Sequence, residues 1–202
     1  MCDGECRVRF TYSKRGRACF VSHVVIPQVF YRALRRAGLS PLMSRGFSPH
    51  PRITLGPALP VGIVGICEPA EIWFGNSIGP LPAKINPYLP EGFHIWNSAD
   101  AEGPSLNKQC NAASYLIMPR DSRKTKLVGD ALSCSAPFRE LLLDCSIEES
   151  SIFLVISNPS GLGPGAMVKY LQSEGILQKW SEICLVRTMV GKWTGSSIQP
   201  MV

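Results

Sequence analysis

The sequence predicts an α+β protein whose first half is a ferredoxin-like, split βαβ unit. Two observations predict this class. Residues 6–96 contain segments with strand, helix, strand, strand, helix and strand character, in that order. The chain of 202 residues is 45% hydrophobic and 18% charged, which is typical of an ordered globular protein with one large core or two smaller ones.

The first strand is expected over residues 6–12, where polar and apolar side chains alternate. Residues 13–17 form a basic turn with one glycine. Residues 18–21 are expected to continue as a short strand. This order places positive charge immediately beside the start of the next element, which is the clearest helix of the chain.

The first helix is expected to begin after Ser22, a residue that can cap a helix, and to end at Ala37 before Gly38. At 100° per residue its apolar side chains share one face. The opposite face carries three arginines, Arg32, Arg35 and Arg36. The helix therefore buries one side and presents a basic stripe on the other.

Proline and glycine interrupt the rest of the first half. Residues 46–51 are expected to be a loop because Gly, Ser-Pro and His-Pro break regular structure. Further strands are expected over 52–55, 63–67, 71–74 and 93–96, and a short helix over 81–89. Residues 63–67 and 71–74 are expected to pair as a hairpin.

The composition divides the chain into a basic unit over 1–96, a polar linker over 97–112 and a second α+β unit over 113–202. The second unit is interpreted as a possible degraded copy of the first. Its expected strands are 114–118, 140–145, 152–156 and 183–189, with a helix over 166–174. Residues 120–137 have no clear pattern.

Positive charge is concentrated in the first part of the chain. The net charge is +6, but residues 1–60 contain 10 Lys and Arg against two acidic residues, whereas residues 61–202 contain 11 against 13. A basic half joined to a nearly neutral half is typical of a polyanion-binding protein. The alternative is a solvated basic face that aids solubility.

The remaining composition indicates a cytoplasmic protein without a membrane segment. The eight cysteines have no regular spacing, the N-terminus lacks the apolar run of a signal peptide, and no apolar run spans a bilayer. We therefore expect reduced thiols and no membrane partner.

Three stretches resemble one protein family in order and spacing. They are Phe20-Val-Ser-His23, Arg32-Ala-Leu-Arg-Arg-Ala-Gly-Leu39, and the segment from Ser44-Arg-Gly-Phe-Ser-Pro-His-Pro-Arg to Pro-Ala-Leu-Pro-Val-Gly62. The chain resembles the radical SAM-linked family DUF2344, most specifically over residues 6–75. The family usually has an acidic residue after Ser-His-Leu, whereas this chain has Val25 there.

This resemblance implies a bacterial, RNA-related setting, because members occur alone or fused to a radical SAM protein, near genes for a ribonuclease and ribosomal proteins. The Cys-x3-Cys-x2-Cys motif of radical SAM enzymes is absent. The resemblance therefore implies a separate radical SAM protein as partner. At the level of fold alone, the chain is similar to RNA-processing proteins of the RAMP type.

The basic residues predict a nucleic-acid surface, because guanidinium groups bind phosphate with two parallel hydrogen bonds. The candidates are Arg15, Arg17, Arg32, Arg35, Arg36, Arg45 and Arg52. Phe47, in the loop after the helix, could stack on an unpaired base. For Phe47 core packing is the alternative, and for the arginines a solvated helix face.

His23 and His50 are candidate catalytic residues, since two imidazoles at one phosphate can cleave RNA by general acid–base catalysis. The alternative is that each only packs or hydrogen-bonds locally. A zinc site built from Cys19, His23 and His50 is the less favoured reading, because the chain has no Cys-x2-Cys. We expect no metal and no cofactor.

Taken together, the sequence predicts an RNA-binding accessory protein, acting on tRNA or rRNA with a radical SAM protein. Two alternatives stay open. One is a metal-independent RNA-processing enzyme that uses His23 and His50. The other is a protein–protein adaptor that docks through the turn at residues 56–61.

Overall fold

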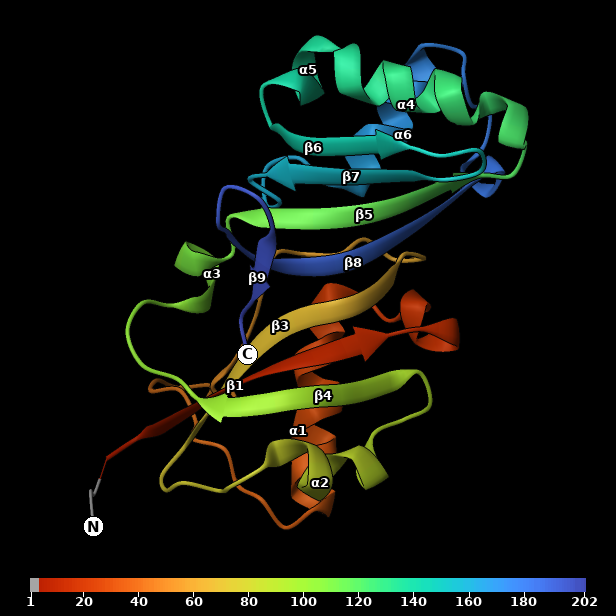
Figure 1. Cartoon of the computed structure of the whole chain (residues 1–202). Coiled ribbons are helices and arrows are strands. Elements are labelled where there is room, and N and C mark those ends of the chain that lie inside the picture. The colour runs from red at the N-terminus through yellow and green to blue at the C-terminus, as the bar shows by residue number, and fades with distance from the viewer. Residues whose placement is uncertain (1–3) are drawn as a thin grey trace.

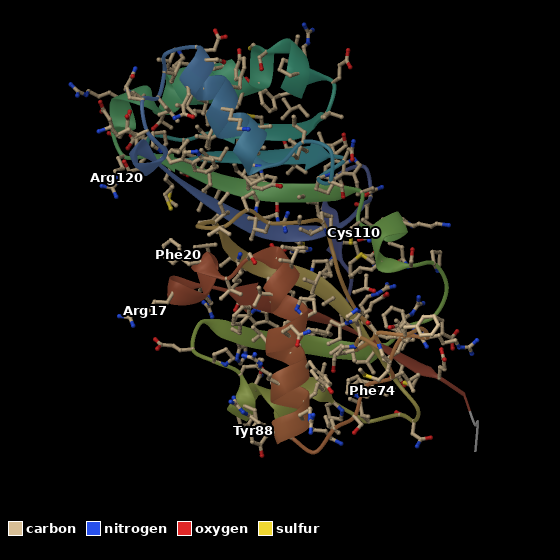
Figure 2. The ribbon with its side chains drawn as sticks, turned by 180° about the vertical axis from the view of Figure 1, so that it is seen from behind. Arg17, Phe20, Phe74, Tyr88, Cys110 and Arg120 are labelled. Atoms are coloured by element: carbon tan, nitrogen blue, oxygen red, sulfur yellow. The ribbon has the colours of Figure 1, made fainter. Side chains whose placement is uncertain are left out.

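The computed structural model describes residues 4–202 and has one mixed sheet of nine strands, with helices against it (Figure 1). The α+β class is confirmed. The main path of the sheet runs β4-β1-β3-β8-β5-β7-β6, while β2 pairs with β3 and β9 pairs with β8. Helices α1 and α6 cover the same face of this sheet, the one nearer the viewer in Figure 2.

The first half contains an antiparallel group of strands in the order β4-β1-β3-β2. The strands are β1 (Cys6–Lys14), β2 (Ile53–Leu55), β3 (Val64–Phe74) and β4 (Phe93–Asp100), and the helices are α1 (Ile26–Arg36) and α2 (Leu81–Ile85). Phe30 of α1 packs edge-on against Phe10 and Tyr12 of β1, with ring centroids 5.2 and 5.0 Å away. The predicted order of elements is the observed one, and the ferredoxin-like description remains a prediction.

The second half has the same strand pattern, in the order β8-β5-β7-β6. Its strands are β5 (Ala112–Pro119), β6 (Leu142–Ile147), β7 (Ile152–Ser157), β8 (Ile183–Trp193) and β9 (Ile198–Pro200). Its helices are α3 (Leu106–Gln109), α4 (Thr125–Cys134), α5 (Ala136–Arg139) and α6 (Pro164–Ser173). A separate hydrophobic cluster packs α4 and α6 against β5, β7 and β8.

The two halves join where β3 pairs in parallel with β8, through the pairs Val64 with Val186 and Gly65 with Arg187. From β8 the fully buried Arg187 reaches Glu68 of β3, with an Nε–Oε1 distance of 2.9 Å. The guanidinium also donates to the carbonyls of Pro57 and Ala58. One side chain therefore ties together both half-sheets and the proline-rich turn.

The predicted hairpin of residues 63–67 with 71–74 is wrong, because both segments belong to the single strand β3. Pro69 lies in the middle of this strand. Its carbonyl accepts from the Gly56 N–H on the side away from β1, and its nitrogen faces that same side. The missing N–H of Pro69 therefore costs no hydrogen bond to β1.

Local structure before α1 also differs from the prediction. Residues 18–21 are not a strand, since 3-10 turn η1 covers Gly16–Phe20. A second 3-10 turn, η2 (His23–Val25), precedes α1, and Ser22 makes no side-chain cap there. The segment expected to be a linker contains the end of β4 and the short helix α3, whose Leu106 is fully buried.

We predict that Arg187→Met destabilises the protein by about 3–5 kcal/mol, because it leaves the carboxylate of Glu68 buried without its charge partner. Urea unfolding monitored by circular dichroism measures this change. The matched control is Arg123→Met, which removes an exposed arginine from its pair with Asp121 and should leave the unfolding midpoint nearly unchanged. A loss below about 1 kcal/mol for Arg187→Met would contradict the role of this ion pair.

Candidate nucleic-acid interface

Helix α1 carries the predicted basic stripe. Its apolar positions Ile26, Phe30, Ala33 and Leu34 are buried, whereas Arg32, Arg35 and Arg36 are exposed. The guanidinium of Arg35 lies 6.0 Å from the ring centre of Tyr31. This division follows directly from the 3.6-residue period of the helix.

The loop after α1 projects from the surface on a closed base. The Ser44 N–H donates to the His50 carbonyl over 2.7 Å, and the His50 N–H donates to Ser44 Oγ over 2.9 Å. Between them Gly46 has φ of +129°, a conformation that L side chains rarely adopt. Phe47 and Arg45 are exposed at the tip, and Phe47 contributes nothing to either core.

The structure brings the loop and the helix together. A hollow of about 260 Å³ is lined by Tyr31, Arg35, Ser40, Pro41 and Met43. A second hollow of about 480 Å³ shares Met43 and is lined also by Glu5, Leu42, Ser44, Arg45 and Arg52. We call these adjoining hollows the basic groove, since it runs from Arg35 to Arg45.

Arg52 differs from the other candidate arginines, because it is already neutralised. Its Nη1 lies 2.6 Å from an oxygen of Glu5, and its guanidinium lies over the ring of Trp73 at 5.1 Å. This side chain holds the N-terminal segment against the groove and is the least available of the set to a ligand.

Arg15 and Arg17 lie away from the basic groove. Arg15 directly precedes η1, and Arg17 belongs to it. The guanidinium of Arg15 lies 5.3 Å from the ring centre of Trp96. Trp96 follows Ile95, which points into the α1 core, so its side chain lies on the opposite face of the sheet from α1. Arg17 projects outward beside the exposed Phe20 (Figure 2).

The positive surface results from where the carboxylates lie. Glu68 and Glu71 are buried and pair with Arg187 and Arg9, and Glu5 pairs with Arg52. Among residues 4–60 the following exposed arginines have no ion-pair partner in the described part of the chain: Arg15, Arg17, Arg32, Arg35, Arg36 and Arg45. The acidic residues thus neutralise mainly internal arginines and leave the surface charge of the first half uncompensated.

The structure does not bring His23 and His50 together. The loop that carries His50 is anchored at the far end of β3, where Leu42 and Arg52 hydrogen-bond with the backbone of Trp73. His23 lies at the other end of this strand, because Val21, two residues before it, accepts a hydrogen bond from Lys14, which pairs with Gly65 of β3. Gly65 and Trp73 are eight residues, or about 26 Å, apart along the strand. A single phosphate therefore cannot contact both imidazoles in this arrangement.

Sequence reasoning missed a buried polar cluster beside His23, made of Lys14, Glu68 and Arg187. Lys14 is only 1% exposed, and its ammonium donates to the Val21 carbonyl over 3.3 Å. Burial lowers the pKa of Lys14. One feature of the sequence does indicate a buried charge. It is an isolated charged residue within a largely apolar run, as in Leu-Val-Arg187. Such a residue must be paired inside a fold, but the sequence does not name its partner.

Two further observations concern the part of the chain that the structure describes. Among residues 4–202, no group of three or more His, Cys, Asp or Glu side chains is placed to hold a metal ion. In the same residues no helix has both the length and the apolar character needed to cross a bilayer.

We predict that protonation of His23 reduces the free energy of unfolding as the pH falls below about 6.5. Burial, and then the positive charge of Arg187, lower the pKa of His23, and Lys14 acts in the same direction while Glu68 opposes them. The unfolded chain therefore binds the proton more readily than the folded chain, and stability is complete only above the unfolded pKa.

The measurement is the free energy of unfolding by urea between pH 5 and pH 8 for the wild type and His23→Gln. The variant should lose the part of the pH dependence that lies below about pH 6.5. His50→Gln, in the exposed loop, is the matched control. Identical slopes for wild type and His23→Gln would refute the prediction.

A family model described as an uncharacterised protein conserved in bacteria (DUF2344) matches residues 7–136, more than half of the chain. The match includes α1, the Ser44–Arg52 loop and the proline-rich turn, the stretches on which the sequence resemblance rested. No curated protein matches the chain. The chain therefore belongs to the DUF2344 family.

Proposed function

We propose that this chain is a cytoplasmic, RNA-binding accessory protein that works with a separate radical SAM protein in the modification of tRNA or rRNA. The main observation in support of RNA binding is the set of arginines beside the basic groove that have no ion-pair partner within residues 4–202. Arg32, Arg35 and Arg36 on α1 and Arg45 on the loop are exposed and have no carboxylate partner within residues 4–202.

Their chemistry suits a ribose-phosphate backbone. A guanidinium remains charged at all physiological pH values and donates two parallel hydrogen bonds to a phosphate. Arginines spaced by three and four residues on one helix face follow one side of a backbone, and each contact releases a counterion. RNA binding should accordingly depend strongly on salt.

Phe47 supports single-stranded RNA in particular. It is fully exposed at the tip of a loop, where it stabilises no core, and Arg45 lies two residues before it. An exposed aromatic ring beside cations can stack on an unpaired base, whereas paired bases are not accessible to it.

The radical SAM partner rests on the family resemblance, and an exposed apolar patch suits a protein partner. Phe20 is 72% exposed, Val24 81% and Val61 51%. The turn that carries Val61 is held against η1 by a hydrogen bond from the Gly62 N–H to the Cys19 carbonyl, 2.9 Å long. Exposed apolar side chains grouped in this way are typical of protein–protein contact sites. The proposal gives His23 and His50 no catalytic role.

We predict that changing Arg32, Arg35 and Arg36 to Gln weakens binding to single-stranded RNA. The slope of log K against log salt, which is negative, should become less steep by about 2, since each lost contact removes about 0.7 from its magnitude. Fluorescence anisotropy with labelled tRNA and rRNA fragments, from low to physiological salt, measures both quantities. The charge-matched control changes Lys126, Lys169 and Lys192, exposed cations of the second half, to Gln. Equal effects of the two triple variants, or no binding at low salt, would exclude the groove as an RNA site.

We predict that Phe47→Ala weakens binding to single-stranded RNA about tenfold or more, because one base loses its stacking partner, and leaves binding to double-stranded RNA unchanged. The thermal midpoint should stay the same, since the ring is fully exposed. Phe20→Ala removes another exposed aromatic, distant from the groove, and serves as control. If both variants bind single-stranded RNA like the wild type, Phe47 has no stacking role.

A further inference from the structure

Two hollows meet at Trp193, on the face of the second half-sheet that helices α4 and α6 do not cover. Ser114 of β5 alternates with the core residues Ala113 and Tyr115, and Val155 of β7 alternates with Leu154. Because successive side chains of a strand point to opposite faces, Ser114 and Val155 lie on the face away from α4 and α6. The site is therefore on the opposite side of the sheet from α1 and α6 (Figure 2).

The first hollow has a volume of about 330 Å³, within the range of about 300–1,000 Å³ that small-molecule sites occupy. Its wall is mostly apolar and includes Phe153, Val155, Met189, Trp193 and Ile198. Three polar side chains interrupt this wall on the sheet side. They are Asp144, whose carboxylate has no ion-pair partner within residues 4–202, and the hydrogen-bonded hydroxyls of Ser114 and Thr188, 2.6 Å apart.

The second hollow is lined by uncharged residues, is more polar than the first, and has a volume of about 490 Å³. Its polar lining consists of Asn107, Asn111, Ser157, Asn158 and Ser160. Trp193 lines both hollows, and its backbone N–H donates to Asn111 Oδ1 over 2.8 Å. In the described part of the chain no lysine or arginine lines either hollow.

The wall formed by β9 is built into the fold. A Cβ at Gly191 of β8 would lie 2.1 Å from the Gln199 carbonyl oxygen, so only glycine allows β9 to approach this closely. The hairpin between the strands is closed by Thr194 Oγ1, which donates to the Ser197 carbonyl over 3.0 Å. Ser197 and Ile198 are thereby held at the rim of the first hollow.

We propose that this pair of hollows binds a nucleoside with a guanine base. The planar base would lie against the apolar and aromatic wall of the first hollow. The ribose hydroxyls would hydrogen-bond in the amide-lined second hollow. The absence of a lining cation argues for a nucleoside without its own phosphate, since a phosphate in such a site would be uncompensated.

Asp144 selects the base. An ionised carboxylate is acceptor-only and takes two hydrogen bonds side by side. Guanine offers two adjacent donors on one edge, N1–H and the N2 amino group. Adenine and cytosine place a ring acceptor beside their amino group, and uracil places carbonyls on both sides of its single N–H, so each would turn a lone pair toward the carboxylate. This inference goes beyond the proposed RNA function, because it concerns a separate site and a free nucleoside.

The experiment is isothermal titration calorimetry of the full chain with guanosine, inosine, adenosine, cytidine and uridine. We expect guanosine to bind best. Inosine lacks the N2 amino group and should bind about tenfold more weakly, since a hydrogen bond to a charged group is worth that much or more. Asp144→Asn should reduce guanosine affinity about tenfold or more and abolish the preference over inosine. Asp130→Asn, on an exposed residue of α4 outside both hollows, should leave affinity unchanged.

Three results would overturn the inference: no binding of any of these nucleosides at millimolar concentration, a preference for a base other than guanine, or guanosine binding that Asp144→Asn does not weaken. Because Asp144 is exposed, its substitution does not threaten folding, and Trp193→Leu gives an independent variant that should also lose guanosine. The Arg32, Arg35 and Arg36 variant should bind guanosine normally. Failure of this site and failure of the RNA groove are thus separately observable.

Discussion

The buried ion pair between Arg187 and Glu68 is the interaction on which the rest of this structure depends. The parallel contact of β3 with β8 spans two register pairs, which is little for the joint between two half-sheets. Arg187 extends that joint with two bonds to Glu68 and two to the carbonyls of Pro57 and Ala58. Burying both charges costs several kcal/mol, and the geometry must be accurate to offset that cost. The pair therefore favours one alignment of the two halves over others.

The same interaction shapes the outer surface. Each buried carboxylate of β3 neutralises a buried arginine, Glu68 with Arg187 and Glu71 with Arg9. Two of the few acidic residues of the first half are thereby withdrawn from the surface. The arginines of α1 and of the loop at residues 44–50 then face solvent without an ion-pair partner among the described residues. The positive surface of the first half thus follows from how the interior is neutralised.

The fold separates two kinds of recognition surface. The basic groove lies where α1 meets the loop, beside exposed arginines and the exposed ring of Phe47. The hollows around Trp193 lie in the other half, on the sheet face that α4 and α6 do not cover, and have apolar and amide linings. A long polyanion suits the first surface and a small uncharged molecule suits the second. The closely packed β9 hairpin creates the second surface.

The sequence by itself determined the α+β class, the order of the elements, the arginine stripe of α1 and the family, because alternation, helical periodicity and local motifs depend on neighbouring residues. Only the tertiary structure decided that β3 is one strand, that Glu5 neutralises Arg52, and that His23 and His50 are apart. It also paired Arg187 with Glu68, 119 residues away in the sequence. Charge pairing and proximity depend on which strands meet in the sheet, and hydrophobic patterning within one segment carries no information about its distant partner.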